Sequence, residues 1–128
     1  MKLSRIHHVA IICSDYKKSK DFYSRILGLK IVQETYREER DSYKLDLAVG
    51  DHTQIELFSF PEAPPRVSYP EALGLRHLAF GIKNLEEALA QLSFEGVQTE
   101  PIRVDEVTGK RFSFIFDPDS LPLELYED

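Results

Sequence analysis

Two histidines and two glutamates recur at nearly the same spacing along this chain of 128 residues. His8 and Glu56 each stand in an apolar, strand-like segment, and the arrangement returns 69 and 68 positions later at His77 and Glu124. Burying a carboxylate without a partner is unfavourable, so a compensating cation is expected beside each glutamate. Two imidazoles and two carboxylates form a nitrogen and oxygen ligand set that suits Ni²⁺, Zn²⁺, Co²⁺, Mn²⁺ or Fe²⁺. We therefore predict that these four side chains bind one divalent metal ion and leave two coordination positions for substrate.

The segments around the four residues predict a duplicated β-α-β-β-β module. Each strand that carries a histidine is followed by an N-capping residue, an amphipathic helix and a glycine at which the helix ends. The first helix is expected over about residues 15–27, before Gly28, and the second from Asn84, with Glu87 as its capping-box partner, to Gly96. Three strands are expected after each helix, at 30–34, 43–49 and 54–60 in the first half and at 98–103, 111–116 and 121–126 in the second.

A proline-rich segment, residues 61–70, separates the two halves. Its prolines prevent a continuous helix or central strand. We predict a single domain made of two modules, 1–60 and 71–128, joined by this linker. A module of about 60 residues buries only a small core, so the modules should pack on each other or on a partner chain, and a homodimer is expected.

Strand alternation predicts which side of each sheet carries the metal candidates. If the first helix covers Ile11, Ile55 and Leu57, then His8 and Glu56 lie on the opposite face, and the second half repeats this pattern. A lone histidine on such a strand is usually a hydrogen-bonded core residue. The metal prediction therefore rests on the repetition of the His and Glu pair.

The strand at 43–49 does not fit this scheme. Strict alternation places Leu45 and Leu47 on the face of the metal candidates and puts the charged Lys44 and Asp46 beneath the helix. Either this strand lies at the edge of its sheet, or the assumed phase is wrong.

The charge and cysteine content disfavour several classes of function. Sixteen Lys and Arg residues against 22 Asp and Glu give a net charge of −6, which repels nucleic acids and acidic membrane surfaces. The lone Cys13 cannot form an intrachain disulfide, and the apolar runs are too short to span a bilayer. We expect a cytoplasmic protein whose partner is a small molecule rather than a nucleic acid or a membrane.

The chain resembles the vicinal-oxygen-chelate superfamily, which unites glyoxalases, bleomycin resistance proteins and dioxygenases, and in particular short glyoxalase I-like proteins. The resemblance covers nearly the whole chain and is carried by residues 8–11, 15–29, 55–57, 74–80 and 117–125. It implies an α+β fold in which two βαβββ modules form a cup-shaped mixed sheet. It also implies a metal at His8, Glu56, His77 and Glu124, in a cup that several relatives assemble between two chains.

The reaction that the resemblance implies is that of a lactoylglutathione lyase-like enzyme. Such a lyase or isomerase removes a proton next to a metal-chelated carbonyl or hydroxyl group, with Glu124 as the base and Glu56 as its near-symmetric counterpart. An extradiol-type dioxygenase is one alternative, although a fourth ligand at Glu56 would crowd its iron. A drug- or metabolite-binding protein on the same fold is another, which the intact ligand set disfavours.

The substrate is less well defined by the sequence. Relatives that use glutathione commonly carry an Arg where this chain has Ile12 and an Asn where it has Phe60, so the substrate is either an adduct of another thiol or not a thiol adduct. Counting back across the turn at 117–120 places Arg111 on the face of Glu124, so Arg111 is the first candidate for a substrate-binding residue, the alternative being an exposed surface charge. Arg37, with Arg40, either borders the mouth of the cup or belongs to a solvated loop.

Overall fold

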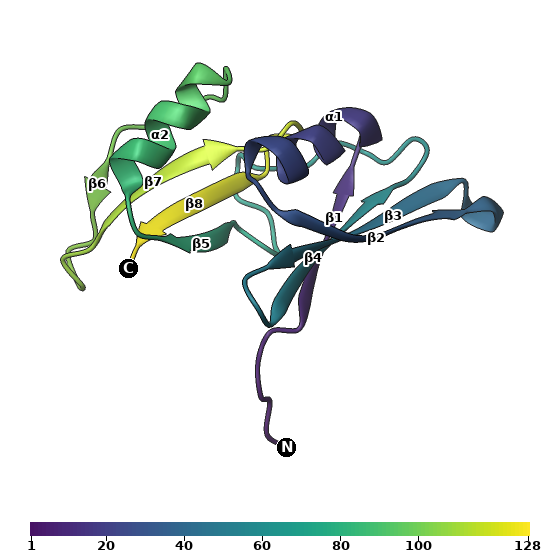
Figure 1. Cartoon of the computed structure of the whole chain (residues 1–128), viewed down its shortest axis with the longest axis horizontal. Helices are drawn as coiled ribbons and strands as arrows, with labels where there is room; N and C mark the ends of the chain where they lie inside the picture. Colours follow the sequence, from purple (N-terminus) through teal and green to yellow (C-terminus); the bar gives the residue numbers. More distant parts are fainter. The chain divides into compact units, whose positions relative to one another are not determined.

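The computed structural model describes residues 1–128 and divides into two compact units (Figure 1). Unit 1 comprises Met1–Pro65 and unit 2 comprises Arg66–Asp128, so the division falls inside the proline-rich segment. Each unit contains one four-stranded mixed sheet and one principal helix. No helix in either unit has the length and apolar character needed to cross a membrane.

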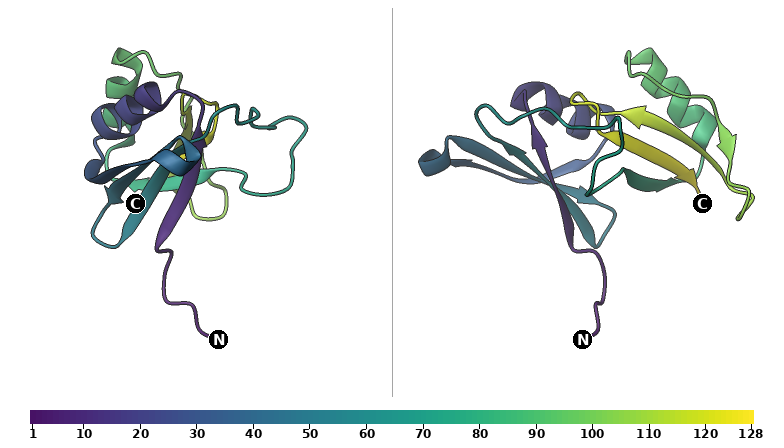
Figure 2. Two further views of the ribbon diagram at one scale, coloured as in Figure 1. Left: turned by 90° about the vertical axis from the view of Figure 1, so that its right-hand side faces the viewer. Right: turned by 180° about the vertical axis from the view of Figure 1, so that it is seen from behind.

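The sheet of unit 1 has the strand order β1-β4-β3-β2. β1 and β4 are parallel, and the other neighbours are antiparallel. Helix α1 lies along one face, and a 3-10 turn closes the tip of the β2–β3 hairpin (Figure 2). The bounds are β1 (His8–Cys13), α1 (Tyr16–Asp21), a π-helical turn (Phe22–Ile26), β2 (Lys30–Arg37), the 3-10 turn (Glu38–Arg40), β3 (Ser42–Val49) and β4 (Thr53–Ser59).

The sheet of unit 2 repeats this topology with the strand order β5-β8-β7-β6. Its helix lies over β7 and β8 (Figure 1). The bounds are β5 (Leu78–Ile82), α2 (Leu85–Phe94), β6 (Arg103–Val104), β7 (Arg111–Phe116) and β8 (Pro122–Glu127). The predicted duplication of a β-α-β-β-β unit is therefore confirmed.

Both helices begin and end at the predicted residues. The Asp15 carboxylate accepts from the Lys18 amide at 3.1 Å, and the Asn84 side chain accepts from the Glu87 amide at 3.1 Å. Gly28 and the glycine after α2 have positive φ, the conformation in which a glycine ends a helix without steric cost. The one departure is that the last turn of the first helix is π-helical.

Alternation separates a buried from an open face in each sheet. In unit 1 the side chains beneath α1 are almost fully buried, and they include Ile11, Leu45, Leu47, Ile55 and Leu57. In unit 2 the face beneath α2 buries Ile115, Leu123 and Leu125, and Leu85 of α2 itself is also fully buried. We call the opposite face of each sheet, which the helix does not cover, the open face.

The phase predicted for the strand at 43–49 is wrong. β3 is an interior strand, and its register pairs Asp46 with Glu56 and Leu45 with Leu57. Because directly opposed residues share a face, Lys44 and Asp46 lie on the open face beside Glu56, and the leucines lie beneath the helix. The charged residues of β3 thereby become neighbours of the metal candidates.

The strand predicted at 98–103 is reduced to β6 and one isolated bridge between Thr99 and Ile115. Pro101 interrupts the predicted segment, and proline has no amide hydrogen to donate to a sheet. The Glu100 amide still donates to the Phe114 carbonyl at 2.9 Å, so the segment follows β7 without forming a regular ladder.

Candidate metal centre

The predicted His and Glu of unit 1 lie together on its open face. His8 Nε2 is 3.4 Å from Glu56 Oε2. The parallel register of β1 and β4 places Glu56 opposite Ala10, two residues after His8, so both side chains leave the sheet on the same side. The carboxylate is mostly buried, with 16% of its side chain exposed, whereas the imidazole is 42% exposed and open to a ligand.

Unit 2 places its own pair in the same register. Glu124 lies opposite Ala79, two residues after His77, and His77 Nε2 is 3.0 Å from Glu124 Oε2. The offset between histidine, strand partner and glutamate is thus identical in the two units. We refer to these as the two His/Glu pairs.

The geometry of each pair suits two ligands of one metal ion. Imidazole nitrogens and carboxylate oxygens bind Zn²⁺ at 2.0–2.2 Å, so neighbouring ligands of such an ion stand about 3 Å apart. The separations of 3.4 and 3.0 Å agree with that spacing. Neither unit gathers a third His, Cys, Asp or Glu side chain close enough to join its pair. Each unit therefore offers two candidate ligands.

The pair of unit 1 has an ionic neighbour that sequence reasoning missed. Lys44 Nζ lies 3.3 Å from Glu56 Oε1 and 3.5 Å from Asp46 Oδ1, and these carboxylates hold the pKa of Lys44 above its usual range. Both oxygens of Glu56 therefore have a cationic or imidazole partner. The phase assumed for β3 from sequence hides this contact, whereas the register of β3 with β4 shows it.

The pair of unit 2 has aromatic neighbours at the equivalent positions. The register pairs Phe114 with Glu124 and Phe112 with Tyr126, so Phe114 stands where unit 1 has Asp46. The ring of Phe114 meets His77 edge to face, with centroids 5.1 Å apart. Within unit 2, Glu124 has a polar partner at Oε2 only, which leaves Oε1 able to accept a proton.

Replacing Lys44 by methionine should strengthen metal binding. Its ammonium group lies 3.3 Å from Glu56 Oε1, a proposed ligand oxygen, and a like charge beside a bound cation would cost roughly tenfold in affinity at high effective dielectric. Titration of the variant with Co²⁺ should therefore give a Kd about tenfold lower than that of the wild type. Lys20→Met is the matched control, because Lys20 pairs with Glu34 away from the His/Glu pair. Unchanged or weaker binding in Lys44→Met would contradict this role.

Arg37 lies on the open face of unit 1, as the prediction of a substrate-facing residue requires. It ends β2 opposite Ser42, and its guanidinium group stacks on Phe58, with Cζ 4.8 Å from the ring centroid. A second ring, Phe60, is contacted by both Arg37 and Arg40, whose Cζ atoms are 5.5 and 5.0 Å from its centroid. The hairpin tip is therefore packed on aromatic rings rather than fully solvated.

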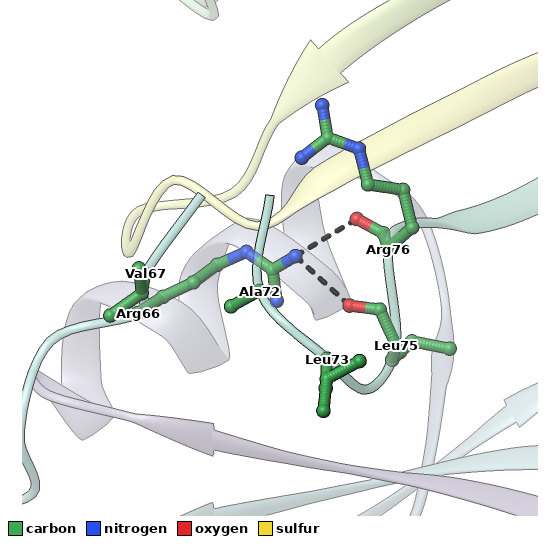
Figure 3. A pocket seen from close by; sticks show the side chains of 6 residues that line it. All are labelled: Arg66, Val67, Ala72, Leu73, Leu75 and Arg76. Atoms are coloured by element: carbon green, nitrogen blue, oxygen red, sulfur yellow. Dashed lines mark hydrogen bonds between the residues drawn. The ribbon is translucent and has the colours of Figure 1, made fainter. Parts of the chain in front are cut away.

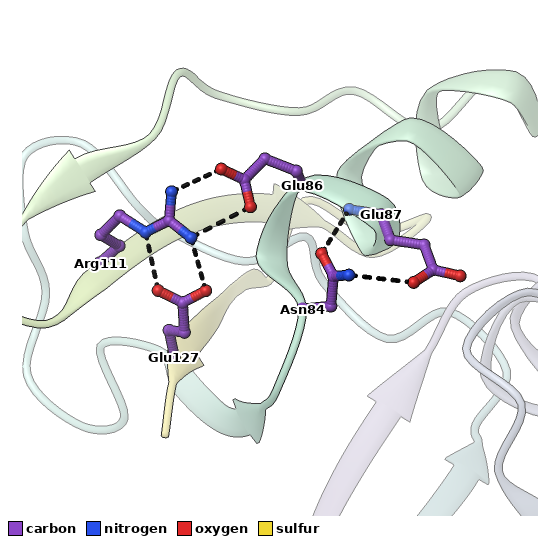
Figure 4. Close-up of polar contacts among 5 residues, drawn as sticks. All are labelled: Asn84, Glu86, Glu87, Arg111 and Glu127. Carbon is purple, nitrogen blue, oxygen red and sulfur yellow. Dashed lines mark hydrogen bonds and ion pairs between the residues drawn. The ribbon is translucent and has the colours of Figure 1, made fainter.

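The prediction that Arg111 shares the face of Glu124 is wrong. The register pairs Phe114 with Glu124, so Arg111 lies on the face that α2 covers. There it donates to Glu127 through two bonds of 2.7 Å and to Glu86 of α2 at 3.0 Å (Figure 4). Its donors are used to join α2 to β8, so it is not a candidate for substrate binding.

Arg111→Met should destabilise the protein in a pH-dependent way. Arg111 holds the pKa of both Glu86 and Glu127 below their ordinary value of 4.5. A carboxylate with a lowered pKa contributes stability above its unfolded pKa, and this contribution is lost as the pH falls through the folded value. The Tm difference between wild type and variant should be full at neutral pH and shrink progressively below about pH 4.5.

The matched control is Arg25→Met, which removes an exposed pair between Arg25 and Asp21 on one helical segment. Such pairs contribute little to stability, so the control should melt close to the wild type. A Tm deficit of Arg111→Met that grows on acidification would contradict the assignment of this arginine to the two carboxylates.

A pocket of about 350 Å³ lies in unit 2, within the loop that precedes His77 (Figure 3). Arg66 crosses it and donates to the carbonyls of Leu75 and Arg76 at 3.0 and 2.9 Å. The lining contains no carboxylate, imidazole or thiol group, so the pocket is separate from the His/Glu pair. The two hydrogen bonds of Arg66 fix the position of the segment that leads into His77.

A family model described as "Glyoxalase/Bleomycin resistance protein/Dioxygenase superfamily" matches residues 5–125. The chain is 62% identical over 127 residues to "Uncharacterized protein YwkD" of Bacillus subtilis, with 99% of both chains covered. It is 56% identical to "Uncharacterized protein YaeR" of Escherichia coli K12, covering 98% of this chain and 97% of the relative. The fold matches the crystal structure of a glyoxalase family protein from Enterococcus faecalis with a TM-score of 0.91 at 50% identity, covering 99% and 100% of the two chains.

More distant relatives have named activities. A lactoylglutathione lyase of Escherichia coli O157:H7 is 27% identical over 129 residues, covering 97% of this chain and 93% of the relative. A putative ring-cleaving dioxygenase of Bacillus subtilis, MhqA, is 33% identical over 69 residues, which are 51% of this chain and 22% of the relative.

Proposed function

The chain belongs to the glyoxalase/bleomycin resistance protein/dioxygenase superfamily, and from that membership we propose that it is a metal-dependent lyase or isomerase acting on a small oxygen-chelating substrate. The observation that carries the proposal is the presence of one His/Glu pair in each unit, at identical strand register. The lactoylglutathione lyase relative, which aligns over nearly the full chain, supports this class of reaction.

The proposed metal ligands are His8, Glu56, His77 and Glu124. This set of nitrogen and oxygen donors suits a divalent ion such as Ni²⁺, Zn²⁺, Co²⁺, Mn²⁺ or Fe²⁺. A cation bound there would polarise two neighbouring oxygens of a substrate and so acidify the adjacent C–H bond.

Glu124 is the proposed base. Its Oε1 has no polar partner within unit 2, whereas both oxygens of Glu56 are in contact with His8 or Lys44. The phenyl ring of Phe114 presents an apolar surface beside the pair. Glu124 would accept the proton from one substrate carbon and return it to the neighbouring carbon, which leaves the carboxylate unchanged after each turnover.

The proposed substrate is a 2-oxoaldehyde adduct of a thiol other than glutathione. Ile12, where relatives that use glutathione commonly carry an Arg, is 54% exposed and offers no charge to a tripeptide carboxylate. Phe60, at the position of their Asn, is covered by two guanidinium groups. Neither residue can make the charge-assisted contacts that would anchor glutathione.

The second candidate is an extradiol-type dioxygenase, which the partial match to the putative ring-cleaving dioxygenase favours. That chemistry needs three open positions on iron for catecholate and oxygen, and four protein ligands would leave only two. Oxygen uptake with catechols separates the two candidates.

A homodimer is also proposed, because unit 2 exposes several large apolar side chains on the loop before β5. Val67, Tyr69, Leu73 and Leu75 are each more than half exposed. Large apolar side chains exposed together in one segment favour an interaction surface, and we assign this one to a second copy of the chain. Light scattering of the purified protein should give twice the chain mass, and a monomer would contradict this proposal.

The function is tested by loading the metal-free protein separately with each of the five metals. Each form is then assayed with methylglyoxal and a panel of thiols: glutathione, cysteine, cysteinylglycine and coenzyme A. We expect metal-dependent thioester formation with a thiol other than glutathione. No thioester with any metal, together with oxygen uptake on catechols, would overturn the lyase assignment in favour of the dioxygenase.

A further inference from the structure

Two arginines at one end of the open face of unit 1 have no acidic partner. Neither Arg37 nor Arg40 lies within ion-pair distance of a carboxylate, although Glu38, Glu39 and Asp41 adjoin them in sequence. The chain as a whole has an excess of acidic residues. Most arginines elsewhere, such as those that pair with Asp21, Glu71, Glu100 and Glu127, do find a carboxylate.

The guanidinium group of Arg37 is held in one position by the side chains around it. It lies over the rings of Phe58 and Phe60, which are themselves stacked with an interplanar angle of 9°. One terminal nitrogen donates to the hydroxyl group of the fully buried Ser42 at 3.0 Å. The Nε–H group is buried and has no acceptor. A buried donor without an acceptor is rare, and here it is fixed beside an unpaired positive charge.

In unit 2 an arginine also stacks on two aromatic rings, but it has a carboxylate partner. The Cζ atom of Arg103 is 5.2 Å from the centroid of Phe112 and 5.4 Å from that of Phe114. Its terminal nitrogen pairs with Glu100 at 3.0 Å. Arg37 therefore makes the same kind of ring contacts as Arg103 and differs from it in having no anionic partner.

The unpaired arginines and the His/Glu pair of unit 1 face the same side of one sheet. Phe58 follows Glu56 by two residues on β4, which is a step of roughly 7 Å along the strand, and Phe60 lies one further step away. A molecule of moderate length can therefore contact Glu56 at one end and Arg37 at the other.

We propose that Arg37 and Arg40, over Phe58 and Phe60, form a binding site for an oxyanion, a carboxylate or phosphate group, at the distal end of the substrate. This deepens the proposed function, since it names a substrate that chelates metal at one end and carries a negative charge at the other. An arginine fork binds such groups through paired hydrogen bonds. The net charge of −6 repels anions elsewhere, so a local cationic site would be needed to select them.

The oxyanion site is tested directly by NMR on the metal-free full chain. The Nε–Hε resonances of Arg37 and Arg103 are assigned with Arg37→Lys and Arg103→Lys, and the wild type is titrated with inorganic phosphate at constant ionic strength. We expect a saturable shift of the Arg37 signal and no saturable shift of the Arg103 signal. If Arg37 does not respond, or if both arginines respond equally, the site is refuted without any assumption about the metal.

The connection to the metal is tested on the Co²⁺-loaded protein with two hydroxamates that differ only in charge. Suberic acid monohydroxamate carries a distal carboxylate, and its methyl ester does not. The wild type should bind the acid roughly tenfold more tightly, since a charge-assisted hydrogen bond is about twice as strong as a neutral one. Arg37→Met should abolish this preference, and Arg103→Met should retain it.

The outcomes separate this proposal from the proposed function. A preference that persists in Arg37→Met overturns the shared substrate site, whereas the proposed metal site stands. If neither hydroxamate binds while phosphate still shifts Arg37, the metal site fails and the oxyanion site stands alone.

Discussion

Replacing Glu124 by glutamine should reduce turnover by a factor of roughly 10²–10⁴, the usual contribution of a general base, while metal binding is retained. Glutamine has the same size and keeps a carbonyl oxygen that can bind a cation, but it cannot accept a proton from carbon. In the structure, Glu124 Oε2 contacts His77 and its Oε1 has no polar partner within unit 2, so this oxygen is the one assigned to proton transfer. The measurement is kcat for the thiol and metal found in the screen, together with the Co²⁺ content of the same sample.

Glu56→Gln is the matched variant, because Glu56 occupies the equivalent register position in unit 1. Its carboxylate is engaged by both His8 and Lys44, so its loss should weaken metal binding more than it lowers kcat at saturating metal. The reverse result, in which Glu56→Gln loses turnover and Glu124→Gln does not, would exchange the roles of the two carboxylates. Full activity in both variants would remove the base assignment altogether.

Replacing His8 or His77 by alanine should lower Co²⁺ affinity by more than about 100-fold. Loss of a residue that only supports a ligand commonly costs 10- to 100-fold, and loss of the ligand itself should exceed that range. Neither unit gathers three candidate ligands, so loss of a histidine leaves its unit with the glutamate of the pair. Isothermal titration of the metal-free variants measures the effect, with circular dichroism to establish that they are folded.

Two further histidines provide controls for this series. His52 is exposed in the turn before β4 and has no contact with either pair, so His52→Ala should bind Co²⁺ like the wild type. His7 Nδ1 lies 2.9 Å from His8 Nδ1, so His7→Ala removes a supporting hydrogen bond and should weaken binding by less than loss of His8 itself. Wild-type affinity in His8→Ala or His77→Ala would contradict the assigned ligand.

The sequence predicted those parts of the molecule that depend on local chemistry or on repetition. The helix caps at Asp15 and Asn84 follow from side chains that can accept from a backbone amide three residues on. The duplicated strand order follows from the repeated segments. The placement of His and Glu on one face in each unit required only the two-residue period of a strand.

The errors have a common cause, which is that alternation gives the period of a strand but not its phase. In antiparallel pairing the loop between two strands decides which residues are opposed. For β3 this pairing brings Asp46 opposite Glu56, and for β7 it brings Phe114 opposite Glu124. Alternation alone therefore does not place Lys44 beside a metal candidate, and it puts Arg111 on the wrong face. Neither loop length nor residue type revealed these registers beforehand.

We propose that the two His/Glu pairs bind one common divalent ion. The deciding measurement is the stoichiometry of Co²⁺ binding to the metal-free wild-type chain, determined by calorimetry and by metal analysis after dialysis. We expect one tightly bound ion per chain. Two equivalent ions per chain, each retained when the other unit's His and Glu are both replaced, would show that the pairs act separately and would contradict it.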